Sequence, residues 1–215
     1  PAHGMGRITE QLAQSLHSTP IHLNTRVMST TPGSVTLENG HTISARAIVV
    51  ATEGPIASSL LSLPTVASQA AGAVYFAAPT SPIEGSYIVL DGEGRGPVYN
   101  VAVMSQVSPY YAPHGQHLIA AALPGLVDGD IEAAARRQLR GWWGAQVDEW
   151  RHLRSYRIPH GQPGQTSPFN PHERVALGEG MFVCGDHRDT ASIQGAMYSG
   201  RRCAESVAEW VTLQS

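Results

Sequence analysis

One stretch near the end of the 215-residue chain carries the residue types that could do chemistry, MFVCGDHRDTASIQGAMYSGRR from Met181 to Arg202. Its pattern predicts a buried strand that stops at Gly185-Asp186, a short loop, and a helix from about Gln194. In open α/β sheets, ligands bind beyond the carboxyl ends of the strands. We therefore expect the Asp186 carboxylate to accept hydrogen bonds from sugar-like hydroxyl groups. The helix start would add backbone N–H donors and a positive dipole end.

The same stretch also has a plainer interpretation. Four residues carry little or no side chain, which would let a flat ring approach the backbone: Gly195, Ala196, Ser199 and Gly200. Small residues are equally typical of tight helix packing, however. The residues alone leave both interpretations open, and in the second Asp186 is only a turn residue. His187 would either line the rim of such a site or face solvent, and we favour solvent.

The elements that must position this stretch begin with the N-terminal quarter. Apolar residues recur every four positions over 8–16, which predicts an amphipathic helix. A strand is expected over 21–27, then a hairpin whose turn is Asn39-Gly40, because Asn-Gly readily adopts positive φ angles. The nearly unbroken apolar run at 45–52 predicts a strand covered on both sheet faces.

The middle of the chain has a different sequence pattern. Residues 73–77, 87–90, 98–104 and 117–123 read as strands separated by proline and glycine turns, which predicts an antiparallel sheet. Asp130 is expected to cap a helix that ends near Trp142-Trp143. The sequence therefore predicts a mixed α/β fold with a β-rich central part and one long helix there.

Composition excludes several classes of function. Only 14% of residues are charged, against about 25% in an average soluble protein. With a net charge of −3 and 7% aromatic residues, the chain lacks the clustered cations and stacking surfaces of a nucleic-acid binder. No apolar run reaches the length of a membrane span. Two cysteines fit a reducing compartment, so we expect a cytoplasmic location.

The stretch GDHRDTASIQGAMYSGRRCAESV, which begins at Gly185, resembles the C-terminal flavin-binding signature of the FAD-dependent amine oxidase superfamily. That group includes protoporphyrinogen oxidases, phytoene desaturase-like proteins and monoamine oxidases. The resemblance implies that Gly185 and Asp186 lie at the ribityl side of FAD. It further implies that Ile193, Gln194 and Ala196 lie near the N1–O2 edge of the ring, with Gly195 in the same set.

The beginning of the chain is similar to the segment where this family re-enters its FAD domain. The matching features are Gly4-Met5-Gly6, a helix, a strand ending at Val27, a hairpin, and a strand ending at Thr52. The resemblance implies that the Val27 backbone contacts the adenine end of FAD and that Thr52 lies close to the cofactor. The two signatures cover about 1–60 and 156–212. They imply FAD-domain segments at 1–64 and 156–215 around a substrate-domain segment at 65–155.

One motif of the family is absent. No Gly-x-Gly-x-x-Gly stands between a strand and a helix, and the glycine cluster at 92–96 is followed by Pro97 and a strand pattern. We therefore interpret the chain as the C-terminal half of a flavoprotein, whose partner is the missing N-terminal FAD-binding half or another chain. The 215 residues alone are not expected to bind FAD tightly.

The other candidates carry weaker signals. The chain has ten histidines but no metal-binding spacing, so we expect no metal site. Tyr156 and His160 fall where the family brings a substrate-domain strand to the flavin, and they are the candidate catalytic residues. The buried-strand and helix positions of Cys184 and Cys203 indicate core residues.

The function expected from the resemblance is hydride transfer from a C–N or C–C bond of a small, apolar substrate to FAD. The pattern YRIP from Tyr156, followed by the C-terminal signature, looks closer to the phytoene desaturase-like and uncharacterised oxidoreductase branch than to monoamine oxidases. The alternative is a separate non-catalytic lobe that serves as a binding or assembly module without flavin and self-associates through an exposed sheet face.

Overall fold

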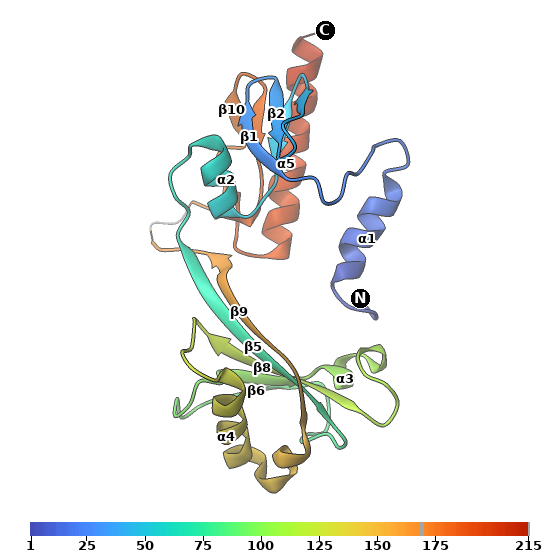
Figure 1. The fold of residues 1–215 in the computed structure, drawn as a ribbon, viewed down its shortest axis with the longest axis vertical. Coiled ribbons are helices and arrows are strands. Elements are labelled where there is room, and N and C mark those ends of the chain that lie inside the picture. The colour runs from blue at the N-terminus through green and yellow to red at the C-terminus, as the bar shows by residue number, and fades with distance from the viewer. Residues whose placement is uncertain (168–169, 215) are drawn as a thin grey trace. The chain divides into compact units, whose positions relative to one another are not determined.

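The computed structural model describes residues 1–167 and 170–214. The chain folds as two compact units (Figure 1). The first consists of Pro1–Ile21 and Ala70–Pro159, and the second consists of His22–Gln69 and His160–Ser215. The fold is mixed α/β, as predicted. Among the described residues, no helix is long and apolar enough to cross a membrane.

The first unit is built on a five-stranded sheet whose order is β6-β7-β8-β5-β9. The pairs β6–β7, β7–β8 and β8–β5 are antiparallel, which confirms the sheet predicted for the middle of the chain. The strands are β5 (Ser68–Ala78), β6 (Ile88–Leu90), β7 (Asn100–Val103), β8 (His117–Pro124) and β9 (Arg151–Pro163). β9 continues through Pro159. Proline is tolerated there because β9 is an edge strand.

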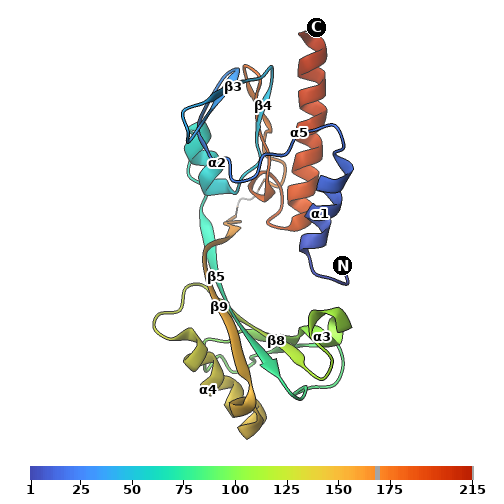
Figure 2. The same ribbon diagram turned by 45° about the vertical axis from the view of Figure 1, so that its right-hand side comes forward.

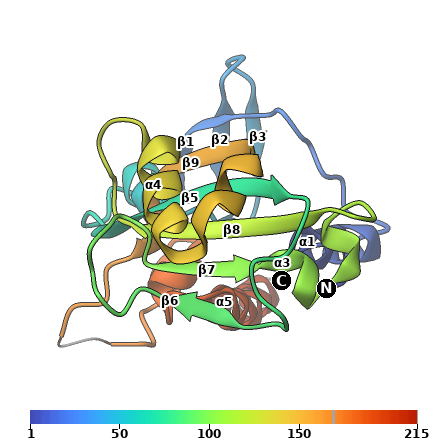
Figure 3. The ribbon, with the colours of Figure 1, turned by 90° about the horizontal axis from the view of Figure 1, so that it is seen from below.

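Helix α4 (Ile131–Trp143) covers one face of this sheet (Figure 3). It begins where predicted, because the Asp130 side chain accepts a hydrogen bond from the Ala133 N–H at 3.0 Å. The 3₁₀ segment η2 (Gly144–Glu149) follows. The core between helix and sheet is apolar throughout and consists of Val74, Phe76, Ala78, Val98, Val101, Val103, Ile119, Ala121, Leu123, Ile131, Ala135, Leu139, Val147 and Trp150.

The N-terminal segment belongs to the first unit. It contains the predicted amphipathic helix, α1 (Gly6–Ser15). Its beginning is anchored to the loop that holds α3 (Met104–Val107) and η1 (Pro109–Tyr111). The Tyr111 hydroxyl donates to the Pro1 carbonyl oxygen at 2.7 Å.

The second unit has a three-stranded sheet in the order β10-β11-β4, made of β10 (Ala176–Gly178), β11 (Met181–Val183) and β4 (Ile48–Val50). Helices α2 (Gly54–Leu61) and α5 (Ile193–Leu213) lie on opposite sides of it (Figure 2). Val50 and Val183 pack against Ala57 of α2. Phe182, whose side chain points to the other face, packs against Cys203 of α5.

A second small sheet in this unit contains β1 (Val27–Thr31), β2 (Ser34–Leu37) and β3 (Thr42–Ser44). The β2–β3 turn contains Asn39-Gly40, as predicted, with Gly40 at φ +82°. The strand predicted over 21–27 is wrong before Val27, because Asn24 adopts φ +53°, which breaks an extended backbone. The run at 45–52 forms a strand only over Ile48–Val50, the residues that pair with β11.

Candidate functional site

The parallel pairing of β4 and β11 brings the two predicted signature segments together. Val183 lies opposite Val50, and the Cys184 N–H donates to the Val50 carbonyl oxygen at 3.0 Å. Both strands therefore end at the same edge of the sheet. A Cβ atom at Gly185 would lie 3.3 Å from the carbonyl oxygen of Thr52. Two predicted site residues from distant parts of the sequence are thus neighbours.

Gly185 is fixed in a conformation that favours glycine. Its φ is +151°, and a Cβ atom there would meet the His187 ring at 2.6 Å. The hydroxyl of Ser199, fully buried in α5, accepts a hydrogen bond from the Gly185 N–H at 2.9 Å and donates to the Gly185 carbonyl oxygen at 2.7 Å. Helix α5 thereby sets the orientation of the turn that carries Asp186.

The start of α5 offers backbone donors. The Ser192 hydroxyl accepts from the Gly195 N–H at 3.0 Å, and the Ser192 carbonyl oxygen accepts from the Ala196 N–H at 3.0 Å. Within the described part of the chain, no acceptor pairs with the N–H groups of Ile193 and Gln194, and both residues are exposed. These two N–H groups lie at the positive end of a helix of 21 residues, where an oxygen-rich or anionic group is favoured.

Gly195 is required by the packing of the protein itself. A Cβ atom at this position would lie 1.9 Å from the Thr190 carbonyl oxygen. Together with the buried Ser199 hydroxyl, this shows that two of the small residues noted in the sequence hold the loop onto α5. At Gly200 a Cβ atom would meet no atom within 4 Å. That Gly195 and Ala196 contact a cofactor stays a prediction.

Asp186 and His160 line one small cavity in the second unit. Asp186 begins the 3₁₀ segment η3 (Asp186–Arg188), and about a third of its side chain is exposed. The cavity has a volume of about 30 Å³, and Glu53 and Ser68 also line it. Its volume suffices for one water molecule. One ring nitrogen of His160, Nδ1, is 2.8 Å from the Ser68 hydroxyl.

His187 is buried, which corrects the expectation that it faces solvent. Its side chain is 1% exposed, and neither ring nitrogen has a hydrogen-bond partner among the described residues. Burial and the Arg188 charge lower the pKa of His187, while the charge of Asp186 opposes this change. The imidazole is therefore neutral at pH 7, and its ring packs against the backbone of Gly185.

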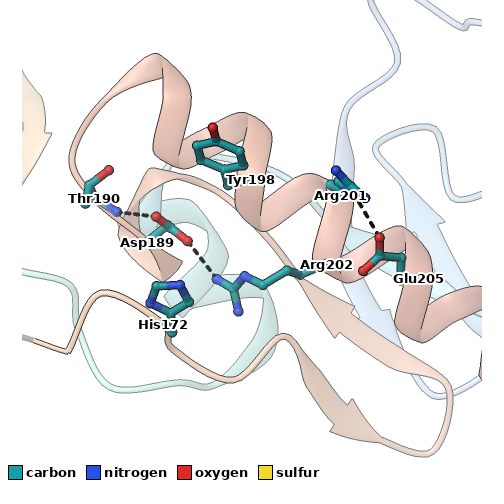
Figure 4. A pocket seen from close by; sticks show the side chains of 7 residues that line it. All are labelled: His172, Asp189, Thr190, Tyr198, Arg201, Arg202 and Glu205. Atoms are coloured by element: carbon teal, nitrogen blue, oxygen red, sulfur yellow. Dashed lines mark hydrogen bonds and ion pairs between the residues drawn. The ribbon is translucent and has the colours of Figure 1, made fainter.

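An ion pair that the sequence did not reveal holds the loop before α5 (Figure 4). Asp189 is buried, accepts from the Thr190 N–H at 2.9 Å, and pairs with Arg202 of α5 at 3.1 Å. Arg202 also donates to the carbonyl oxygens of Glu173 and Arg188. A cavity of about 540 Å³ lies beside this pair. The charges of Asp189 and Arg202 are paired with each other, so we interpret the pair as a structural contact that positions the loop and not as a ligand-binding group.

The two cysteines are core residues, as predicted. Cys184 follows β11 and Cys203 lies on α5, and both are free and buried. A hydrogen bond between the thiols and burial together raise the pKa of Cys203. A protonated, buried thiol is a poor nucleophile, and this applies to Cys203. The same hydrogen bond lowers the pKa of Cys184 to about 7, and burial separates this thiol from solvent.

Two predicted residues do not belong to this edge of the sheet. Val27 begins β1, where it is half-buried and lies opposite Leu37. Tyr156 belongs to the first unit, on β9, where its ring stands edge-on to Tyr75 with centroids 5.9 Å apart. The structure therefore brings together Thr52, Gly185 and Asp186, and it adds Ser199 and Asp189, which sequence reasoning had not identified as positioning residues.

The geometry defines what this edge can bind. It offers a carboxylate that accepts hydrogen bonds, unpaired N–H groups at a helix start, and no group of metal-ligating residues among the described residues. Such a set suits a ligand with hydroxyl groups and carbonyl oxygens.

Comparisons with known proteins bear on the fold and the family of the chain. No curated protein matches the sequence. Among solved structures, the chain is similar to reduced UDP-galactopyranose mutase (TM-score 0.62, 12% identity, 88% of this chain and 46% of that one). It is also similar to the halogenase PltM (0.57, 13%, 96% and 45%) and to an oxidoreductase from Methanosarcina mazei (0.54, 14%, 84% and 48%). These likenesses show the fold, and the chain spans about half the length of each protein.

The sequence profile of one family covers nearly the whole chain. The profile described as flavin containing amine oxidoreductase matches residues 1–208. It includes both signature segments and the sheet between them. The chain therefore belongs to the flavin-containing amine oxidoreductase family.

Proposed function

We propose that this chain is the C-terminal portion of a FAD-dependent oxidoreductase that takes a hydride from a C–N or C–C bond of a small, apolar substrate. The observation that carries the proposal is the parallel pairing of β4 and β11, which joins Thr52 to Gly185 and Asp186. Family membership supports the flavin, and a variant of the halogenase PltM was solved in complex with FAD.

The residues present fit a flavin by the chemistry of their donors and acceptors. The Asp186 carboxylate would accept hydrogen bonds from ribityl hydroxyl groups. The N–H groups of Ile193 and Gln194, which have no acceptor within the described residues, would donate to a ring carbonyl oxygen, with Ala196 beside them. The Val27 backbone would contact the adenine end. When bound, the flavin supplies the hydride acceptor.

The role of this chain is then to orient the bound flavin and to stabilise the negative charge that develops on it. Donors held at a helix start need no rearrangement when negative charge develops on a facing oxygen atom. The Ser199 hydroxyl and the Asp189–Arg202 pair keep the turn and the helix start in place. His160 and Tyr156 remain the candidates for contact with the substrate.

The open edge of the β10-β11-β4 sheet is evidence that a further polypeptide segment pairs with this sheet. β4 is an edge strand, and Val49, at its centre, is 44% exposed. Parallel strands are normally covered on both faces, and an unpaired strand edge can pair with a strand of another segment. We assign residues 1–64 and 156–215 to a flavin-binding part and 65–155 to a substrate-binding part. These bounds differ from those of the compact units, in which Pro1–Ile21 belongs with the central sheet. The half that carries the absent Gly-x-Gly-x-x-Gly motif would complete this sheet, from the same or another polypeptide.

The finer assignments rest on the sequence. We propose that the chain is closer to the phytoene desaturase-like and uncharacterised oxidoreductase branch of the family than to monoamine oxidases, from the YRIP pattern at Tyr156 and the C-terminal signature. We propose a cytoplasmic location from the two free cysteines.

The same exposed edge also favours one alternative, a non-catalytic lobe that binds no flavin and pairs through β4 with a partner or a second copy. Binding of FAD by the purified chain discriminates between the two functions. The change in anisotropy of flavin fluorescence, measured with increasing protein, reports that binding directly.

We expect measurable binding of FAD with a Kd at or below about 1 mM, roughly 4 kcal/mol. Asp186→Ala and Ala196→Trp should each weaken binding about tenfold, or roughly 1.4 kcal/mol. Asp128→Ala, at an exposed loop, and Ala208→Trp, at an exposed position of α5, are the matched controls. A folded chain that binds no FAD would favour the non-catalytic lobe, and equal binding by site and control variants would exclude the assigned residues.

A further inference from the structure

The five-stranded sheet of the first unit has a second face that α4 does not cover. Along β5 and β8, side chains alternate between the core and this face. Val74 and Ile119 are buried beneath α4, whereas Ala73, Tyr75 and Ala120 are only half-buried. An antiparallel sheet with one solvated face normally carries polar residues on that face. Here the uncovered face is apolar, which indicates that it receives an apolar group.

This face has a floor of alanines. The register places Tyr75 opposite Ala120, and Ala120 lies opposite Ala102 on the next strand. Ala73 lies opposite Ala122 in the same way. Methyl side chains next to one another leave a shallow recess in which a flat molecule can lie against the strands.

Larger side chains turn the recess into a cavity of about 390 Å³. Its apolar lining comes from three strands and consists of Ala73, Tyr75, Leu118, Leu153, Tyr156 and Ile158. This volume is at the small end of ligand pockets, which span roughly 300–1,000 Å³. The cavity therefore suits a ligand of the size of a substituted aromatic ring.

Among the described residues, Arg154 is the one charged residue that lines this cavity. Its guanidinium carbon lies 5.3 Å from the centre of the Tyr156 ring, and Tyr156 stands at 87° to Tyr75. Throughout the described ranges, 1–167 and 170–214, Arg154 forms no ion pair. A guanidinium that is held on an aromatic face and has no hydrogen-bond acceptor among the described residues is suited to bind a carboxylate through two parallel hydrogen bonds.

We infer that this cavity binds a small molecule with a flat apolar body and a carboxylate, and that Arg154 selects the carboxylate. The apolar body lies on the alanine floor beside Tyr75 and Tyr156. Calling this molecule the substrate rests on the proposed function, whereas its binding does not. This makes the substrate of the proposed oxidoreductase an apolar acid rather than a neutral hydrocarbon.

Binding is tested on the purified chain without FAD, by isothermal titration with phenylacetate, its neutral amide phenylacetamide, and the cation phenethylamine. We expect the chain to bind phenylacetate about tenfold more tightly than phenylacetamide and to bind phenethylamine most weakly. Arg154→Met should remove the preference for phenylacetate over phenylacetamide. Arg137→Met, an exposed arginine on α4, is the matched control and should preserve it.

A second variant tests whether the apolar cavity is required for binding. Ala73→Leu should fill the cavity that Ala73 lines and abolish binding of both phenylacetate and phenylacetamide, and thermal unfolding shows whether the unit remains folded. Because Arg154 is exposed, the arginine variant gives a result even if the Ala73 variant unfolds. Equal affinity for acid and amide, an unchanged preference in Arg154→Met, or no binding of phenylacetate would each overturn the inference. Since no flavin is present, these outcomes are independent of whether the chain binds FAD.

Discussion

Replacing Ser199 with alanine removes one buried hydroxyl from beneath the turn that carries Asp186. That hydroxyl accepts from the Gly185 N–H at 2.9 Å and donates to the Gly185 carbonyl oxygen at 2.7 Å. The substitution deletes both bonds and adds no bulk, so its effect reports the bonds themselves. The side chain is fully buried, and water cannot replace the lost partner without entering the core.

The expected magnitude follows from these two bonds. A net contribution of about 1 kcal/mol per hydrogen bond, or the desolvation cost of a buried donor left unpaired, gives a loss of roughly 1–3 kcal/mol. In a domain of this size about 1 kcal/mol corresponds to roughly 2–4 °C in Tm. We therefore expect Ser199→Ala to lower Tm by about 3–10 °C.

The assay is thermal unfolding followed by far-UV circular dichroism, with urea unfolding to convert the shift into free energy. Ser206→Ala is the matched control, because Ser206 lies on the same helix and forms no side-chain hydrogen bond within the described residues. Equal stability of the two variants would refute the claim that the Ser199 hydroxyl holds the turn.

Three further predictions concern the same unit. Gly195→Ala should destabilise the fold by more than Gly200→Ala in thermal unfolding, because its Cβ atom would lie 1.9 Å from a backbone carbonyl oxygen and the other would meet nothing within 4 Å; equal effects would contradict this. Because the pKa of His187 is lowered by burial, the unfolded chain binds the proton more readily, and the stability advantage of neutral His187 is lost as pH falls below about 6.5. Compared with His187→Phe in urea unfolding, the native chain should lose stability toward pH 5 with a slope of at most about 1.4 kcal/mol per pH unit, and a pH-independent difference would exclude the effect. Cys184 and Cys203 should react with a thiol reagent only after unfolding; rapid labelling of the native chain would contradict their burial.

Local signals explain which parts of the fold could be predicted. The capping position of Asp130 and the Asn39-Gly40 turn depend on a few adjacent residues, and both were correct. The strands at 73–77 and 117–123 carry long apolar stretches because both faces of the sheet are apolar.

Other parts depend on pairing between distant segments. The run at 45–52 reads as a long strand, but only Ile48–Val50 finds a partner. Strand β9 includes Pro159, which local rules interpret as a loop, because the sequence does not show that the strand is at an edge.

The site residues divide in the same way. Gly185 and Asp186 could be identified because a strand, a glycine and an acidic residue are consecutive. The burial of His187 and the role of Ser199 could not, because each depends on α5 packing beneath the turn. The ion pair between Asp189 and Arg202 joins the loop before α5 to the helix itself. The spacing of the two residues in the sequence does not show whether their charges are paired and buried or separate and exposed.

Hydrogen–deuterium exchange of the chain with and without saturating FAD tests the central claim most directly. If the ends of β4 and β11 and the start of α5 form one flavin-binding surface, FAD should slow exchange in peptides that contain Thr52, Gly185-Asp186 and Ile193-Gln194. Peptides from α4 in the first unit should be unaffected. Protection confined to other segments, or none at these three while FAD is bound, would contradict the account.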